Sequence, residues 1–178
     1  MTGPGSAPAA SRGPATLATV IPLFLLAAWL GASLLTAAVV APAAFAVLPS
    51  RTLAGALVGR VLPVLFLSGA AVGGLVGLAG WRRGAGQRGT VVAALTIVAA
   101  CLVAQLVIGP RIERLRARAG APIDALERTD ARRVAFGRLH GASVLALGLA
   151  MLAGSAALAV GTRALVRPEG IPGRVVRR

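Results

Sequence analysis

The sequence has few of the side chains from which catalytic and metal sites are built. Its 178 residues include one cysteine, one histidine, no tyrosine and five acidic residues. A zinc or copper site needs three or four converging ligands, so one chain of this kind is poorly suited to chelate either metal. The lone cysteine, Cys101, excludes an intrachain disulfide, and its place in an apolar run is typical of a thiol that packs as a small hydrophobic residue. The sequence contains no recognisable catalytic constellation.

Lysine is absent as well, and acidic residues are outnumbered. All 19 basic residues are arginine, and they give the chain a net charge of +14. The arginines lie in the breaks between apolar runs, as basic residues do beside membrane spans, where they attract anionic lipid headgroups. A nucleic-acid site would need aromatic stacking platforms, which this sequence is too poor in aromatic residues to supply. We therefore expect a lipid bilayer with anionic headgroups as the partner, and no nucleic acid.

Long apolar runs are what the sequence has in abundance. Hydrophobic residues make up 57% of the chain and charged residues 13%, against about a quarter charged in soluble domains. A membrane span needs about 20 apolar residues, and four runs meet this requirement. They predict an all-α fold, an integral membrane four-helix bundle. The predicted transmembrane domain covers residues 17–162, with spans at about 17–41, 60–81, 90–109 and 139–161.

The ends of the chain have a different composition. Residues 1–16 are mostly glycine, proline, alanine and serine, which predicts a disordered lead, and residues 163–178 form a basic tail. The first apolar run is about twice as long as the core of a signal peptide. We therefore expect a retained helix, although Ala44-Phe45-Ala46 resembles a cleavage site.

One charged segment, residues 110–138, separates the third span from the fourth. It holds eight arginines and four of the five acids. Gly120 and the proline that follows it predict a break, after which an amphipathic helix leads into the fourth span. The spacing predicts three ion pairs along helical faces: Asp124 with Arg128, Glu113 with Arg116, and Asp130 with Arg133.

Prolines and an arginine set the expected limits of the spans. Pro42 cannot donate a hydrogen bond to the Ala38 carbonyl, which predicts a kink or an interfacial bend. An arginine at mid-bilayer costs about 2.5 to 3.5 kcal/mol, so Arg60 is expected at an interface. The helix from Arg60 to Trp81 would then be about 30 Å long, close to one hydrocarbon thickness. Pro110 is expected to end the third span.

The arginines also bear on orientation. With four spans, the side that bears both termini carries nine arginines and the opposite side carries ten. The loop at 81–89 and the tail are short and dense in arginine, so we expect both termini in the cytoplasm.

Small residues at regular intervals predict close packing between the helices, since small side chains let backbones approach within a membrane. They occur in two series: Gly69, Gly73 and Gly77 in the second span, and Gly141, Gly148, Ser155 and Thr162, with Gly137, in the fourth. Packing within one chain and a homo-oligomer interface are both compatible with these patterns.

Two polar residues within the spans are candidates for a functional role. His140 is the one group that titrates near neutral pH, and it lies about 3 Å of helix beyond Arg138. Ionisable residues within membranes are often functional, although His140 could also reach the interface or bond another helix. Gln105, near one end of the third span, is expected to form a hydrogen bond with another helix.

Several short motifs occur in an order that is typical of one family. The first half of the chain contains Trp29-Leu-Gly31, Val40-Ala-Pro42-Ala-Ala-Phe45, Leu48-Pro49-Ser50-Arg51, Ala54-Gly55 and Leu62-Pro63. The second half contains Pro110-Arg111-Ile112 and Phe136-Gly-Arg-Leu139-His140-Gly141-Ala-Ser143. Over residues 17–160 the chain resembles the transmembrane protein 205-like family, whose bacterial members are a domain of unknown function. One departure is Leu147, where the family often has an asparagine.

The resemblance implies a multi-pass protein of the bacterial cell membrane without an established activity. The family is distantly similar to the copper-resistance protein D type of membrane fold and, through it, to haem-associated proteins. That similarity is the reason for naming haem as a cofactor, with His140 as its ligand, although we expect no cofactor and no metal from the residues themselves.

Three functions stay open at this point. The leading interpretation is a non-enzymatic membrane protein that acts through helix packing or partner contacts, since packing motifs are abundant and catalytic ones are absent. The second is a haem-dependent membrane oxidoreductase that uses His140. The third is a homo-oligomeric transporter of ions or small molecules.

Overall fold

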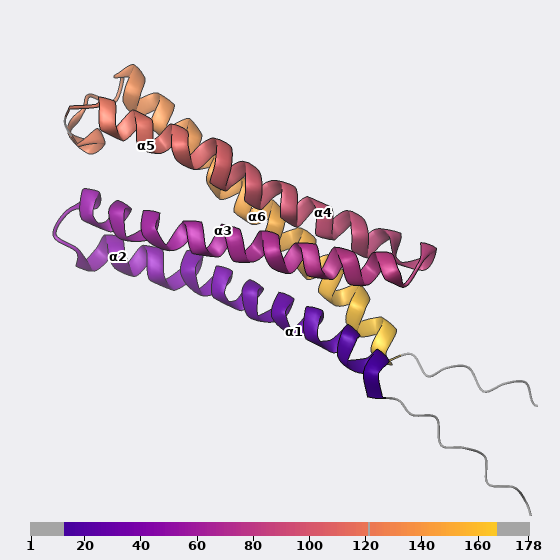
Figure 1. Cartoon of the computed structure of the whole chain (residues 1–178). Helices are drawn as coiled ribbons and strands as arrows, with labels where there is room; N and C mark the ends of the chain where they lie inside the picture. Colours follow the sequence, from indigo (N-terminus) through magenta and orange to yellow (C-terminus); the bar gives the residue numbers. More distant parts are fainter. Residues whose placement is uncertain (1–12, 121, 167–178) are drawn as a thin grey trace, which may run out of the picture.

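A computed structural model of the chain describes residues 13–120 and 122–166 (Figure 1). Most of the predicted lead and tail, residues 1–12 and 167–178, lies outside the described residues. The elements are α1 (Gly13–Leu35), η1 (Thr36–Val40), α2 (Ala41–Val47), α3 (Arg51–Arg82), η2 (Ala85–Gln87), α4 (Arg88–Leu102), η3 (Val103–Ile108), α5 (Gly109–Arg118), η4 (Ile123–Ala125) and α6 (Ala131–Val166).

These elements form four long antiparallel rods: α1 with η1 and α2, then α3, then α4 with η3 and α5, and finally α6. The pairs α1–α3, α3–α4, α4–α6 and α6–α1 pack against each other, so the rods close into a four-helix bundle. Each rod contains a stretch long and apolar enough to cross a membrane. The predicted all-α four-helix bundle is confirmed.

The outer surface of the bundle is apolar. Only 22 to 33% of the residues in the most apolar window of each rod are buried inside the protein. Large side chains such as Phe24, Leu145 and Leu152 are 70 to 74% exposed. Exposure of this much apolar surface to water is unfavourable, whereas its contact with the hydrocarbon of a bilayer is favourable. The chain is therefore a multi-pass membrane protein.

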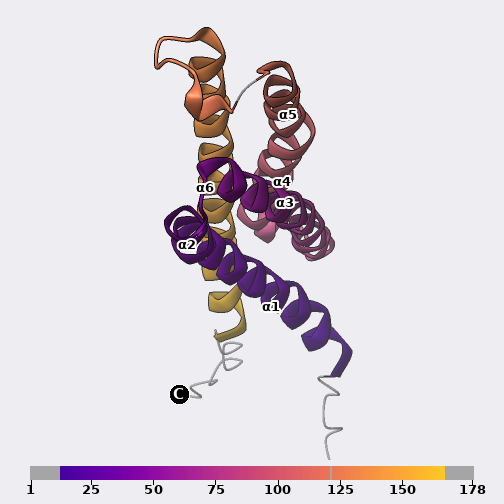
Figure 2. The same ribbon diagram turned by 90° about the vertical axis from the view of Figure 1, so that its left-hand side faces the viewer.

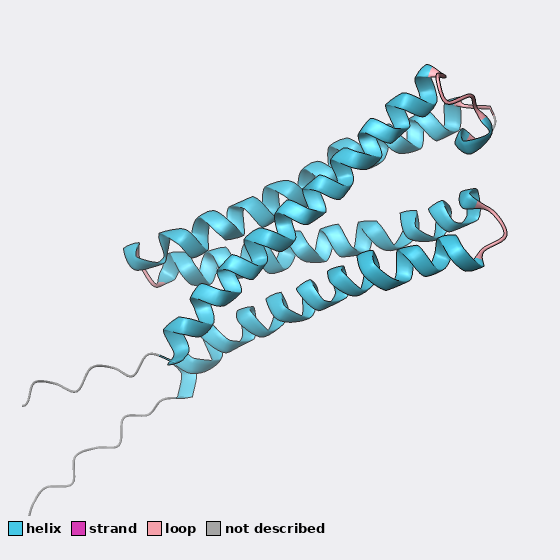
Figure 3. Ribbon diagram, turned by 180° about the vertical axis from the view of Figure 1, so that it is seen from behind, coloured by secondary structure: helices cyan, strands magenta, loops and turns pink. Residues whose placement is uncertain are grey.

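The rods cross instead of running parallel. Near the chain ends, α6 packs on α1 through two glycines, with Gly161 against Leu23 and Gly154 against Leu30. Toward the opposite end α6 diverges from the α1–α2 rod (Figure 2). Loops are confined to the two ends of the bundle (Figure 3). The end that carries the α2–α3 and α5–α6 connections is consequently more open than the end that carries the chain termini.

Two prolines interrupt their helices less than the sequence predicted. The π-helical turn η1 precedes Pro42, and the Ala41 N–H bonds the Thr36 carbonyl five residues back. Likewise η3 precedes Pro110, and the Gly109 N–H bonds the Ala104 carbonyl. Proline has no N–H to donate, and its ring clashes with the carbonyl four residues earlier. The wider π-helical turn accommodates the proline, so each helix continues through it. The first rod thus extends to Val47, and the third rod continues past Pro110 as α5 to Arg118, while the expected end of the membrane span at Pro110 stays a prediction.

The charged segment between the last two rods contains less helix than predicted. Gly120, at φ 68°, ends α5 as expected. Residues 123–125 form only a single 3-10 turn, and α6 starts at Ala131, so the amphipathic helix predicted from Ile123 onward is wrong before that residue. Asp124 and Arg128 therefore do not share a helical face.

Arginines hold this connection in place. Arg132 donates to the Ala119 carbonyl at 3.0 Å, and Arg133 donates to the Leu126 carbonyl at 2.6 Å. The predicted pair of Glu113 with Arg116 is present at 3.2 Å. Asp130 pairs with Arg132 at 2.8 Å instead of with Arg133. That difference arises because Asp130 precedes α6 and turns back to cap it.

Asp130 is expected to protect the first turn of α6. Its Oδ1 accepts a hydrogen bond from the Arg132 backbone N–H at 2.8 Å, as an N-cap does. We expect Asp130→Ala to make the amides of residues 131–134 exchange with solvent roughly several-fold faster, measured by hydrogen–deuterium exchange in micelles. Asp124→Ala, which removes an acid from the same loop without uncapping a helix, should change nothing there.

The effect should depend on pH. Hydrogen bonds from Arg132 lower the pKa of Asp130 from 3.8 to about 2. A carboxylate whose pKa is depressed by folding stabilises the native state above its unfolded pKa and stops doing so as the pH falls through the folded one. The wild-type protein and Asp130→Ala should therefore differ at pH 6 and converge near pH 2. Equal exchange at pH 6 would contradict the cap.

A candidate ligand cleft between α3, α5 and α6

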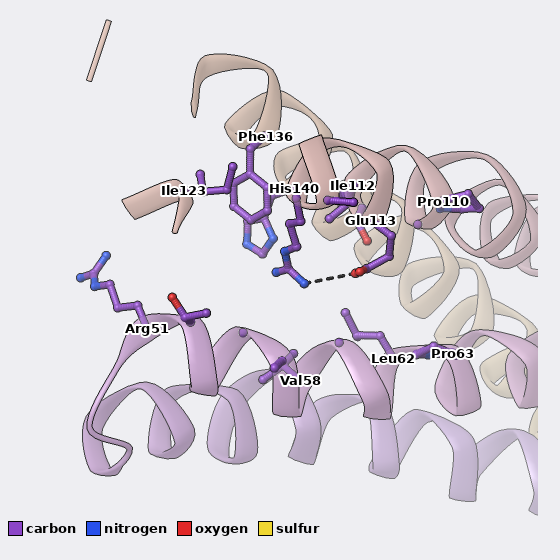
Figure 4. A pocket seen from close by; sticks show the side chains of 18 of the residues that line it. Arg51, Val58, Leu62, Pro63, Pro110, Ile112, Glu113, Ile123, Phe136 and His140 are labelled. Carbon is purple, nitrogen blue, oxygen red and sulfur yellow. Dashed lines mark hydrogen bonds and ion pairs between the residues drawn. The ribbon is translucent and has the colours of Figure 1, made fainter. Parts of the chain in front are cut away.

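A cleft of about 980 Å³ lies at the open end of the bundle, with α3 on one side and α5 and α6 on the other (Figure 4). Its shape follows from helix directions. α4 packs on α3, but beyond the π-helical turn η3 and Pro110 the rod continues as α5, which packs on α6. On the facing wall, Gly55 and Gly59 have no side chains to fill the space between α3 and α5.

The cleft changes character along its length. Its inner part is lined by Leu62, Pro63, Phe66 and Ala104. At its mouth the lining is polar and charged: Arg51, Thr52, Glu113, Arg116 and Asp124. From Arg51 to Phe66 the wall formed by α3 is about 22 Å long. Such a site suits a molecule with one apolar and one polar end.

A stack of three flat groups forms part of the wall. The Arg116 guanidinium lies over the Phe136 ring, 5.3 Å from its centroid. On Phe136 stacks the imidazole of His140, with centroids 6.1 Å apart and planes inclined by 9°. Arg116 also reaches α3, because its guanidinium nitrogens lie 3.3 and 3.6 Å from where Cβ atoms would be at Gly55 and Gly59. Because the two glycines have no side chains, the Arg116 guanidinium has room to lie against α3.

Backbone and amide groups add polar positions to this wall. Pro63 has no N–H to donate to the Gly59 carbonyl, so that oxygen lacks its usual partner within α3. Gln105 and Ser143 also line the cleft. The expectation that Gln105 bonds another helix stays a prediction.

Several residues singled out in the sequence meet at the cleft, although they come from distant segments. Its lining includes Phe45, Gly55, Pro63, His140 and Ser143. They come from α2, α3 and α6. Haem ligation by His140 stays a prediction.

Other predicted residues lie elsewhere and take part in packing. Trp29 is buried, and its Nε1 donates to the Leu65 carbonyl at 2.9 Å. Gly69 lies under the Trp29 ring, while Gly73 and Gly77 face α4. Each glycine of this ridge thus lies against a neighbouring helix of the same chain.

The remaining predicted positions have no close neighbour or lie in connections. A Cβ added to Gly31, Gly141 or Gly148 would meet nothing within 4 Å. Pro42 lies in α2, and Pro49 lies in the turn before α3. Because Ser155 and Thr162 of the same series are exposed, the α6 series faces outward. A homo-oligomer through this face stays a prediction.

Sequence reasoning misses the role of Arg116 and Gly59 in the cleft. The spacing of Arg116 marks it only as the partner of Glu113 on a solvated face. The available signal is Gly55-x-x-x-Gly59, which repeats at one helical turn and marks a face of α3 without side chains. The sequence does not indicate which arginine crosses to that face.

A comparison with protein families identifies the family of the chain. The model of a domain of unknown function, DUF4149, matches residues 24–121. The chain belongs to the DUF4149 family. The DUF4149 match covers the α3 wall of the cleft and the η3–α5 wall, whereas Phe136 and His140 of α6 lie beyond it. No curated protein and no solved structure gives a significant match to this DUF4149 chain.

Proposed function

We propose that this DUF4149 protein is a non-enzymatic membrane protein that binds an amphiphilic molecule from the bilayer in the cleft between α3 and α5. The observation that carries the proposal is the change from an apolar inner part to a charged mouth within one cleft of about 980 Å³. Amphiphiles are bound where apolar walls meet a few placed polar groups. The sequence predicts a protein that acts through helix packing or partner contacts, and the proposal assigns the partner contact to this cleft.

The depth of the cleft in the membrane supports the same ligand class. If Arg60 and Trp81 mark the two interfaces, Leu62 and Phe66 lie on the hydrocarbon side of Arg60, and Arg51 lies on the headgroup side. Trp81 is 75% exposed, as an interfacial anchor would be. The cleft then spans the level at which lipid headgroups join their chains.

The polar groups of the cleft are arranged for binding more than for proton transfer. His140 stacks on Phe136 and Glu113 bonds Arg116, and no hydrogen bond joins His140 to Glu113 within the described residues, so the two do not form a proton-transfer pair. General acid–base catalysis needs such groups within reach of one reacting atom. A binding role does not require such a pair.

Photo-crosslinking tests the proposal directly. The full chain in vesicles is irradiated with a monoacylglycerol that carries a diazirine in its acyl chain, and the labelled peptides are mapped by mass spectrometry. We expect saturable labelling at the cleft residues Leu62 and Ile112, removed by excess unlabelled monoacylglycerol. Outward-facing Leu67 and Leu145 should be labelled in proportion to the probe and without competition. Labelling at Leu62 and Ile112 that fails to saturate would contradict a binding site.

The other interpretations of the sequence are separate proposals. A haem on His140 would give a Soret band in the absorption spectrum of the purified protein, and His140→Ala would remove it. The transporter alternative and the transmembrane protein 205-like name rest on sequence patterns alone. Cytoplasmic termini, proposed from arginine density, would place the mouth of the cleft toward the opposite leaflet.

A further inference from the structure

We propose that the cleft selects a zwitterionic phospholipid with a primary ammonium headgroup, phosphatidylethanolamine in chemical class. In this arrangement Arg116 binds the phosphate and Glu113 binds the ammonium. This inference rests on the proposed function and adds the identity of the headgroup. The ion pair between the two side chains, present at 3.2 Å, is exchanged for two ion pairs with the lipid.

The charge at the mouth distinguishes it from the rest of the protein. The chain has 19 basic and five acidic residues, and most of its surface therefore favours anions. Yet two of the five acids, Glu113 and Asp124, line this one cleft together with two arginines, Arg51 and Arg116. A mouth with balanced charges gives an anionic headgroup no net attraction. A headgroup that itself carries one charge of each sign complements it.

Arg116 is placed to bind a phosphate. It lies in the last turn of α5, and its guanidinium extends across the cleft toward Gly55 and Gly59. Contact with the Phe136 ring orients the planar group. Guanidinium has five N–H donors in a fixed fork, and one of its nitrogens donates to Glu113. Among the described residues, this is the one hydrogen bond that the Arg116 guanidinium donates, so its other donors can form the two parallel bonds by which arginine binds phosphate oxygens.

Glu113 is placed to release Arg116 and accept an ammonium. The two residues are one helical turn apart, and the side chains of Arg116 and Glu113 are 33% and 68% exposed. An ion pair this exposed contributes little to stability, so a ligand can displace it. Before displacement the two side chains lie 3.2 Å apart, so the freed carboxylate stays next to the phosphate that Arg116 binds. An ethanolamine ammonium donates hydrogen bonds to a carboxylate, which a choline group cannot do because it has no N–H.

The same vesicle assay measures headgroup preference by displacement. Unlabelled dioleoyl phospholipids with ethanolamine, glycerol or choline headgroups compete with the monoacylglycerol probe for Leu62 and Ile112. We expect the ethanolamine lipid to displace the probe at about tenfold lower concentration than the other two, as one additional charge-assisted hydrogen bond implies. Equal displacement by all three lipids, with saturable labelling intact, would overturn the headgroup assignment and leave the binding site standing. Absence of saturable labelling would overturn both proposals.

Two substitutions give effects in different directions. Glu113→Gln removes the negative charge that pairs with ammonium and with Arg116, so the order should reverse in favour of the glycerol lipid. Arg116→Gln removes the phosphate site, so displacement by all three phospholipids should weaken by about tenfold. An unchanged lipid order in Glu113→Gln would contradict the proposal.

Matched controls come from the same segment. Arg114 lies on α5 and Glu127 in the loop beyond it; both are exposed and neither lines the cleft. Arg114→Gln changes the net charge as Arg116→Gln does, and Glu127→Gln changes it as Glu113→Gln does; both controls should leave the lipid order and the displacing concentrations unchanged. If Arg114→Gln weakened displacement as much as Arg116→Gln, general surface charge would account for binding.

Discussion

Gly69→Val is expected to destabilise the folded bundle by about 3 kcal/mol or more. A Cβ at position 69 would lie 2.7 Å from three atoms of the Trp29 ring, which is closer than van der Waals contact permits. The ring cannot move aside at low cost, because it is buried and its Nε1 donates to the Leu65 carbonyl. Unfolding in mixed micelles, followed by circular dichroism, measures the loss.

Gly74→Val is the matched control on the same helix. A Cβ at Gly74 would meet nothing within 4 Å, and the position is exposed. Both variants make the same chemical change in the interior of α3, so helix propensity is altered equally. We expect Gly74→Val to change the free energy of unfolding by less than about 1 kcal/mol. Equal destabilisation by the two variants would contradict the packing of Trp29 on Gly69.

Gly59→Leu is expected to reduce saturable labelling of the cleft by about tenfold while the fold stays intact. Leucine at position 59 would extend into the space between α3 and α5 and push the Arg116 guanidinium away from the wall, since that group lies 3.6 Å from the position of the new Cβ. Leucine also favours helix over glycine by roughly 0.5 to 1 kcal/mol, so this variant should not unfold. Lost binding would therefore be an effect on the site.

The control for this second substitution is Gly74→Leu. It adds the same side chain to the same helix at a position that faces outward. Labelling at Leu62 and Ile112 should equal that of the wild-type protein. If Gly59→Leu retained full saturable labelling, the amphiphile would have to bind elsewhere on the protein.

The four spans could be predicted from the sequence because hydrophobicity is a local property. Each apolar run has at least the roughly 20 residues that a bilayer requires, and no partner is needed to recognise it. The helix limits were harder to predict. A proline at position 42 or 110 can end a helix or be taken up by a π-helical turn, and the choice depends on packing by other rods.

The glycine patterns show what sequence periodicity can predict about helix packing and what it cannot. The ridge of Gly69, Gly73 and Gly77 predicts a packing face, and in the structure it lies against α1 and α4. On α6, Gly154 packs on α1, whereas the predicted series runs through the adjacent position, Ser155, which is exposed. Consecutive residues of an α-helix point in directions about 100° apart around its axis. A sequence pattern identifies a face of small residues but not the helix that covers it.

The cleft could be predicted only in fragments. The sequence motifs contain several of its residues, among them Gly55, Pro63 and His140. Their meeting depends on the divergence of α5 from α3 beyond η3, which no local pattern encodes. Arg116 resembles the other arginines of its segment until the Gly55–Gly59 face is placed opposite it.

The most direct measurement of the central claim is the position of a bound amphiphile. Solution NMR of the methyl-labelled protein in deuterated detergent, with protonated monoolein added, would report which side chains contact the ligand's acyl chain. We expect nuclear Overhauser effects from the acyl chain to the methyl groups of Leu62 and Ile112 that saturate with ligand. Contacts confined to outward-facing leucines such as Leu67 and Leu145 would contradict it.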